Sequence, residues 1–124
     1  MKYKSEIQEA LNLIVRKLDD GKAEKIVKLD VRKISTITDV MVIATGTSTR
    51  HVMALAHHLA EDLKKHKMLP LNDVHQGDGN WVVIDLGSVL VHIFTSEARA
   101  KYNLEEMWQV SKLKRTRKAP RKSA

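Results

Sequence analysis

Six histidines are the side chains with the chemistry to act as bases or metal ligands, because the sequence contains no cysteine. Two of them precede acids by four residues, His57 before Glu61 and His58 before Asp62, so each could pair along a helix as readily as it could bind metal. Neither an HExxH zinc motif nor a GxSxG serine motif occurs. We therefore expect no metal site and hydrogen-bonding roles for the histidines: His51, His57, His58, His66, His75 and His92.

Two other features could support phosphate chemistry. Residues 46–48, Gly-Thr-Ser, precede a helical pattern and could hold a phosphate on backbone amides, although a plain strand-to-helix turn uses the same small residues. Nucleotidyl transfer with two metals needs paired carboxylates on one side of a strand, two residues apart. Asp85 has Val83 before it and Gly87 after it at that spacing. The sequence thus predicts no catalytic residue, no cofactor and no enzyme, with a nucleotide-binding or nucleotidyltransferase enzyme as the alternative.

The stretch WVVIDLGSVLVHIF at 81–94 gives the strongest structural signal. Two apolar runs flank Gly87 and Ser88, and a glycine first in a two-residue loop favours the type II′ turn of an antiparallel hairpin. If Leu86 pairs with Val89, the register places only aliphatic side chains on one face. These are Val82, Ile84, Leu86, Val89, Val91 and Ile93.

The opposite side of this hairpin, which we call the mixed face, carries Trp81, Val83, Asp85, Leu90, His92 and Phe94. Aromatic rings beside Asp and His resemble the composition of a recognition surface. A second, partly polar core layer under a helix fits the same pattern, and both interpretations stay open. On the first interpretation, the residues that bind a partner are Trp81, Val83, Asp85, His92 and Phe94.

Apolar periodicity elsewhere predicts the element order αββαββα and hence one α/β domain, with a mixed sheet and flanking helices. Ser5 and Gln8 suggest a capping box, Gly21 a helix stop, and Ser48 or Thr47 an N-cap. The predicted helices are 5–20, a second that follows this N-cap and ends near 66, and 97–102 with a further turn at 104–108. The strands predicted outside the hairpin are 27–31 and 40–45.

Charge is distributed unevenly along the 124 residues, of which 43% are hydrophobic. Residues 112–124 hold seven of the 22 Lys and Arg residues and no acid, so residues 1–111 retain 15 bases against 15 acids. We divide the chain into a domain, 1–111, and a basic tail, 112–124, that is expected to be disordered in isolation. The tail either solubilises the protein or contacts RNA. The RNA-binding candidates are Lys112, Lys114, Arg115, Arg117 and Lys118.

We expect no signal peptide, transit peptide or membrane span from this sequence. No apolar run approaches the roughly 20 residues of a membrane span. The N-terminus has neither the apolar stretch of a signal peptide nor the composition of a transit peptide. Together with the lack of cysteine, these features predict a cytoplasmic protein with no membrane partner.

Two segments, DVRKISTITDVMVIATGTSTRHV and GNWVVIDLGSVLVHIFTSEARAKYNLEEMW, resemble the Iojap family, and within it the bacterial ribosomal silencing factors. The patterns TDxxVIATGTS, WVxxDxG, VxVHxF and ExRxxYxLExxW occur in this order, and the similarity covers residues 5 to about 110. The resemblance implies a nucleotidyltransferase-like fold without catalytic acids. It also implies binding to the large ribosomal subunit through its fourteenth protein, which blocks joining of the small subunit and represses translation under nutrient limitation.

The resemblance assigns the family's contact tryptophan to Trp81, with Asp85 and His92 as matched neighbours. Three further matches, which could equally be structural, lie at Arg99, Tyr102 and Trp108. The turn has Gly87-Ser88 where the family commonly has Gly-Asp, and the tail lies outside the quoted motifs. The free protein is also a candidate homodimer through the hairpin face.

Overall fold

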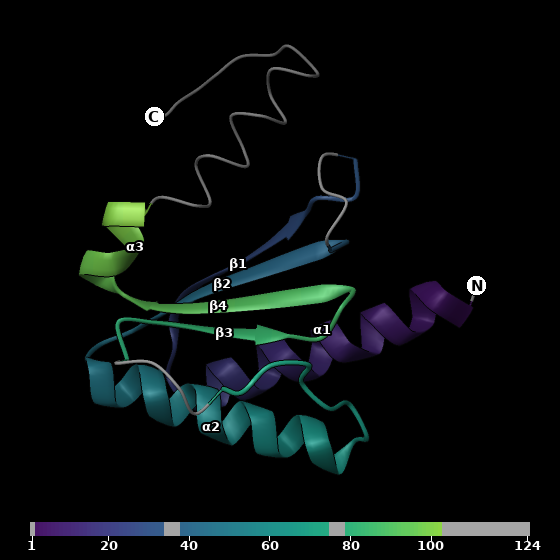
Figure 1. Ribbon diagram of the computed structural model, residues 1–124, viewed down its shortest axis with the longest axis horizontal. Coiled ribbons are helices and arrows are strands. Elements are labelled where there is room, and N and C mark those ends of the chain that lie inside the picture. The colour runs from purple at the N-terminus through teal and green to yellow at the C-terminus, as the bar shows by residue number, and fades with distance from the viewer. Residues whose placement is uncertain (1, 34–37, 75–78, 103–124) are drawn as a thin grey trace.

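The computed structural model describes residues 2–33, 38–74 and 79–102, with side chains from residue 7 onward. The predicted order αββαββα is confirmed (Figure 1). The elements are α1 Lys2–Asp20, β1 Glu24–Asp30, β2 Val40–Gly46, α2 Thr49–Lys65, β3 Trp81–Asp85, β4 Val89–Thr95 and α3 Ser96–Tyr102. The predicted turn at 104–108 and the basic tail lie outside the described residues.

The four strands form one mixed sheet in the order β1-β2-β4-β3. The central strands β2 and β4 are parallel, whereas β1 and β3 pair antiparallel along the two edges. β2 is buried at every position except Val40, as expected for an apolar strand without polar alternation. The predicted fold class, a single α/β domain with a mixed sheet and flanking helices, is thus confirmed.

Helices α1 and α2 lie side by side on one face of the sheet (Figure 1), where Lys17 Nζ is 3.5 Å from Asp62 Oδ2. Their apolar stripes pack on the aliphatic face of the hairpin and on Val42 and Ala44 of β2. Because side chains alternate across a strand, the mixed face points to the other side of the sheet. The short α3 lies on that side, at the end where β4 finishes (Figure 1).

The predicted hairpin register is confirmed. Leu86 N–H donates to the Val89 carbonyl at 2.9 Å, and the aliphatic pairs follow in step. Gly87 has a φ of 85°, a conformation that side chains rarely adopt. Ser88 N–H donates to the Leu86 carbonyl at 3.1 Å, which is the bond of a γ-turn rather than of the predicted type II′ turn.

Two predicted boundaries differ from the structure by three residues, and the other described boundaries by no more than one. Helix α1 begins at Lys2, so Ser5 lies within it and the predicted capping box is wrong. The residues before Ser5 continue the helical turn, which overrides the local capping signal. Strand β1 begins at Glu24 instead of residue 27, because a bulge between Glu24 and Val27 breaks the two-residue period that revealed the rest of the strand.

Gly21 follows the last residue of α1 as predicted, but it does not supply the left-handed turn. That conformation belongs to Lys22, with a φ of 69°, and Ala23 N–H closes the turn on the Leu18 carbonyl at 2.9 Å. A Cβ on Gly21 would lie 2.6 Å from Leu55 Cδ2, so any larger residue there would require the Leu55 side chain to shift.

Candidate functional site

The mixed face combines a core layer with a partly exposed surface. His92 is only 6% exposed and Phe94 is fully buried. On β3, Trp81, Val83 and Asp85 are each partly exposed. The five predicted binding residues therefore lie together, but only the three on β3 present much surface to a partner.

Trp81 is held from several sides. It lies directly opposite Phe94 in the strand pair, with ring centroids 5.0 Å apart in an edge-to-face arrangement. The ring of Tyr102, from α3, is centred 4.6 Å from the indole. The indole Nε1–H donates to Nδ1 of His92 at 3.0 Å. These contacts fix one orientation of a large side chain that remains partly exposed.

The bond from Trp81 also defines the protonation of His92. Because an indole N–H can only donate, Nδ1 of His92 is the acceptor and the neutral ring carries its proton on Nε2. Burial lowers the pKa of His92 from 6.5 to about 4, so the imidazole is neutral at physiological pH. Within the described part of the chain, its buried Nε2 has no hydrogen-bond partner.

Asp85 and the loop residue Asn72 form hydrogen bonds with backbone groups along β3 and its turn. Oδ1 of Asp85 accepts the Gly87 N–H at 2.9 Å, which supports the hairpin turn. Asn72 donates its Nδ2 to the Val83 carbonyl at 2.8 Å and accepts the Asp85 N–H at 2.9 Å. Its amide thus takes the place of a neighbouring strand. No local pattern in the sequence signals this role.

Arg99 attaches α3 to β1 and β2, on the side of the sheet away from β3. Its Nη1 lies 2.8 Å from the Lys25 carbonyl and 2.7 Å from Oγ1 of Thr45, and donates to both. Since Tyr102 belongs to the same short helix, the contacts of Arg99 help to hold that ring against Trp81. Two of the three C-terminal motif residues accordingly have structural contacts.

The turn at residues 46–48 uses its polar groups internally. Ser48 is the N-cap of α2, as one of the two predicted candidates, and its Oγ accepts the His51 N–H at 3.1 Å. Thr47 N–H donates to Nδ1 of His51 at 2.9 Å, which leaves Nε2–H to donate to the Gly21 carbonyl at 2.8 Å. This geometry supports a strand-to-helix turn rather than a phosphate cradle. Among the described residues, no group of three His, Asp or Glu could hold a metal ion.

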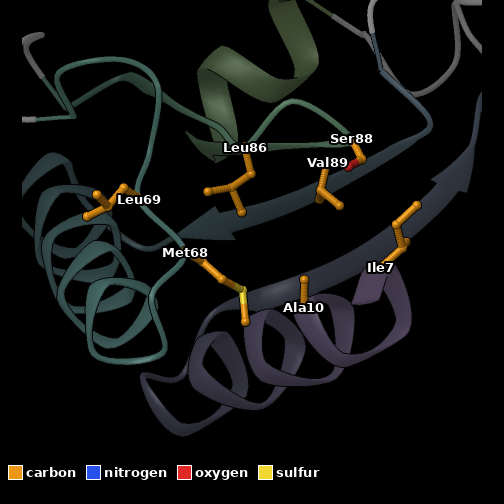
Figure 2. Close-up of a pocket in the computed structure, with 7 residues that line it drawn as sticks. All are labelled: Ile7, Ala10, Met68, Leu69, Leu86, Ser88 and Val89. Atoms are coloured by element: carbon orange, nitrogen blue, oxygen red, sulfur yellow. The ribbon is translucent and has the colours of Figure 1, made fainter. Parts of the chain in front are cut away.

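A groove lies on the helix side of the sheet, away from the mixed face (Figure 2). It has a volume of about 260 Å³, and its wall offers a hydroxyl but no titratable group. This groove therefore lacks the side chains for catalysis. Its lining residues are Ile7, Ala10, Met68, Leu69, Leu86, Ser88 and Val89.

The family model described as "Ribosomal silencing factor during starvation" matches residues 4–124, which include the whole mixed face. The chain belongs to the RsfS family of ribosomal silencing factors. The resemblance to the Iojap family, inferred from the motifs, is thereby confirmed. The match to the RsfS model also runs through residues 112–124, beyond the last quoted motif.

Individual RsfS relatives and structures agree with this assignment. The ribosomal silencing factor RsfS of Halalkalibacterium halodurans is 41% identical over 101 residues, covering 82% of this chain and 86% of that protein. A crystal structure of a Chromobacterium violaceum protein is 34% identical, with a TM-score of 0.79, and covers 83% of this chain and 86% of that one. The mouse protein named "Mitochondrial assembly of ribosomal large subunit protein 1" is 33% identical over 101 residues, which cover 79% of this chain but 44% of the relative.

The RsfS motifs correspond to distinct parts of the site. Trp81 and Asp85 of the WVxxDxG pattern provide the partly exposed ring and the support of the turn. His92 comes from the VxVHxF pattern and accepts the indole N–H. Arg99 and Tyr102 come from the C-terminal pattern and hold α3 in place. Described residues from the second and third motifs thus contact the tryptophan of the first.

Proposed function

We propose that this RsfS-family protein binds the large ribosomal subunit through the subunit's fourteenth protein, with Trp81 as the central contact. Bound there, it prevents association with the small subunit and represses translation under nutrient limitation. The protein acts in the cytoplasm as a binding factor and not as an enzyme. Family membership and the name of the mouse relative, which refers to the large ribosomal subunit, support this choice of partner.

The partly exposed indole of Trp81 carries this proposal. Tryptophan is enriched among the side chains that dominate binding energy at protein interfaces, because one ring buries a large area at low entropic cost. Trp81 is held by Phe94, Tyr102 and His92 before any partner arrives. A pre-positioned ring loses little freedom on binding, so more of its contact energy contributes to affinity.

Val83 and Asp85 extend the same surface along β3. Both are partly exposed and lie on the face that carries Trp81. Asp85 accepts one hydrogen bond from Gly87 through Oδ1 and has capacity for further donors. An aromatic centre beside an aliphatic and an acidic group suits a protein partner with an apolar patch and a basic side chain.

The basic tail, 112–124, adds a charge-based contact to ribosomal RNA in this proposal. Its seven bases, without an acid, would neutralise phosphates near the docking site. Contacts to phosphates carry no sequence information, so the preference for one subunit comes from the folded domain.

Sedimentation of the full chain with isolated bacterial large and small subunits tests the choice of partner. We expect co-sedimentation with large subunits only, and a dose-dependent loss of joined ribosomes when both subunits are mixed. A purified fourteenth protein should compete with the large subunit for binding. Equal binding to both subunits, or unchanged joining at saturating protein, would contradict the proposal.

A further inference from the structure

His92 contributes little to the stability of the fold, but it helps to fix the geometry of the proposed binding surface. It is 6% exposed, and no residue of the described chain bonds to its Nε2. A buried donor without a partner destabilises a fold relative to an apolar side chain of similar size. Stability alone would therefore favour an aliphatic residue at this position, between the apolar neighbours Ile93 and Val91.

The other ring nitrogen of His92 makes one specific bond. Nδ1 accepts the indole N–H of Trp81 at 3.0 Å, from the diagonal position of the strand pair. This bond satisfies the single polar atom of the indole inside the protein, so the side chain contacts a partner through its apolar ring. It also selects one rotation of the indole, since Nε1 must point inward.

We propose that His92 is a positioning residue, which presets the indole of Trp81 for the partner without touching the partner itself. This inference rests on the proposed function, because it assigns a role within the same binding surface. The imidazole acts through its Nδ1 acceptor, while Phe94 and Tyr102 restrict the ring from the sides. The buried Nε2 lowers local stability, while the same ring provides the Nδ1 acceptor. Functional sites typically lose some stability in this way.

Two substitutions separate positioning from packing. His92→Leu is apolar and removes the acceptor, whereas His92→Asn keeps an acceptor near the place of Nδ1 but buries two amide donors. We expect the melting temperature of His92→Leu to equal or exceed that of the wild type, and that of His92→Asn to be lower. We expect the opposite order for binding to large subunits, with His92→Asn within about twofold of the wild type and His92→Leu about fivefold weaker.

The indole N–H signal of Trp81 in ¹⁵N-labelled protein gives a direct readout of the bond. Trp81→Phe assigns this signal, because the chain has one other tryptophan, Trp108. In His92→Leu the signal should move upfield and exchange faster with solvent, and in His92→Asn it should stay close to its wild-type position. This measurement decides the role of Nδ1 even if His92→Asn proves too unstable for binding assays.

The outcomes distinguish this inference from the proposed function. If His92→Leu binds the large subunit as tightly as the wild type does, the positioning role is overturned and the proposed function is not. Unfolding of His92→Leu, or equal loss of binding in both variants, also overturns it, because His92 would then act through packing. Failure of the wild type to bind large subunits overturns the proposed function and the positioning role with it.

Discussion

A neutral imidazole inside the mixed face determines how Trp81 is held. Burial lowers the pKa of His92 to about 4, and the Trp81 N–H occupies the nitrogen that would take up a proton. Protonation of Nδ1 would place two donors against each other and break this bond. At the scale of single residues, the surface proposed for binding is therefore linked to the charge state of one buried ring.

The stability of the domain should fall in acid through His92. The folded-state pKa of about 4 lies below the ordinary value of 6.5, so the unfolded chain binds more protons between them. The contribution of the neutral ring is fully present above pH 6.5 and is lost as the pH falls towards 4, by about 3 kcal/mol at most.

Urea unfolding of the wild type and His92→Leu at a series of pH values measures this effect. The difference between the two free energies of unfolding isolates His92, since the other titratable groups are common to both proteins. We expect the wild type to lose stability relative to His92→Leu between pH 6.5 and 4. Parallel curves over that interval would show that His92 titrates normally in the folded protein.

At the scale of elements, a short helix completes the surface of a long hairpin. Helix α3 has only seven residues, too few to be stable alone, and Arg99 attaches it to β1 and β2. Through Tyr102 this helix forms one side of the Trp81 cluster. The orientation of the indole thus depends on a contact made at the opposite edge of the sheet.

Arg99→Ala should lower the free energy of unfolding by about 2 kcal/mol, because two bonds from a charged donor are lost. It should also shift the indole N–H signal of Trp81, since Tyr102 is no longer held. Arg16→Ala, which removes an exposed arginine of α1, is the matched control for the loss of charge. Equal stability of the two variants in urea would mean that Arg99 does not attach α3.

Local patterns predicted the elements well because each pattern lies within one element. The register of the hairpin followed from Gly87 and the alternation of side chains, and the Gly21 and Ser48 boundaries lie where expected. Contacts between distant residues leave no such pattern. Arg99 and Lys25 are 74 residues apart, and the left-handed residue after α1 is a lysine.

The sequence predicted which residues form the candidate site but not the contacts between their side chains. Strand pairing placed Trp81 opposite Phe94, whereas the bond from Trp81 to His92 is diagonal and depends on side-chain rotation. The sequence left a binding surface and a second core layer as alternatives. In the structure, His92 and Phe94 of the mixed face are buried and the three residues on β3 are partly exposed, because burial is set by neighbouring elements such as α3 rather than by the hairpin itself.

At the scale of the whole molecule, charge is balanced in residues 1–111 and strongly basic in residues 112–124. The balance of 15 bases against 15 acids in residues 1–111 makes the tail the source of the net charge of +7. We propose that the domain chooses the large subunit and that the tail adds affinity through RNA. The two contributions should respond differently to salt.

Truncation after Ser111 should weaken binding to large subunits at low salt and flatten the dependence of affinity on salt. Each phosphate contact contributes a slope of roughly 0.7 to 0.9 in log affinity against log salt. A full-length variant with glutamine at the seven basic positions is the control for length. Loss of preference for the large subunit on truncation would place the function in the tail, and an unchanged slope would exclude RNA contact.

The most direct test of the central claim is to measure the affinity of Trp81→Ala for isolated large subunits. Thermal melting checks that the variant is folded. Loss of a central aromatic contact should cost more than about 2 kcal/mol of binding, or roughly thirtyfold in affinity, while the domain stays folded. Leu69→Ala is the matched control, because Leu69 is 64% exposed, lines the groove on the helix side and should bind like the wild type. A folded Trp81→Ala variant with wild-type affinity would contradict the account, as would a variant that loses binding only because it unfolds.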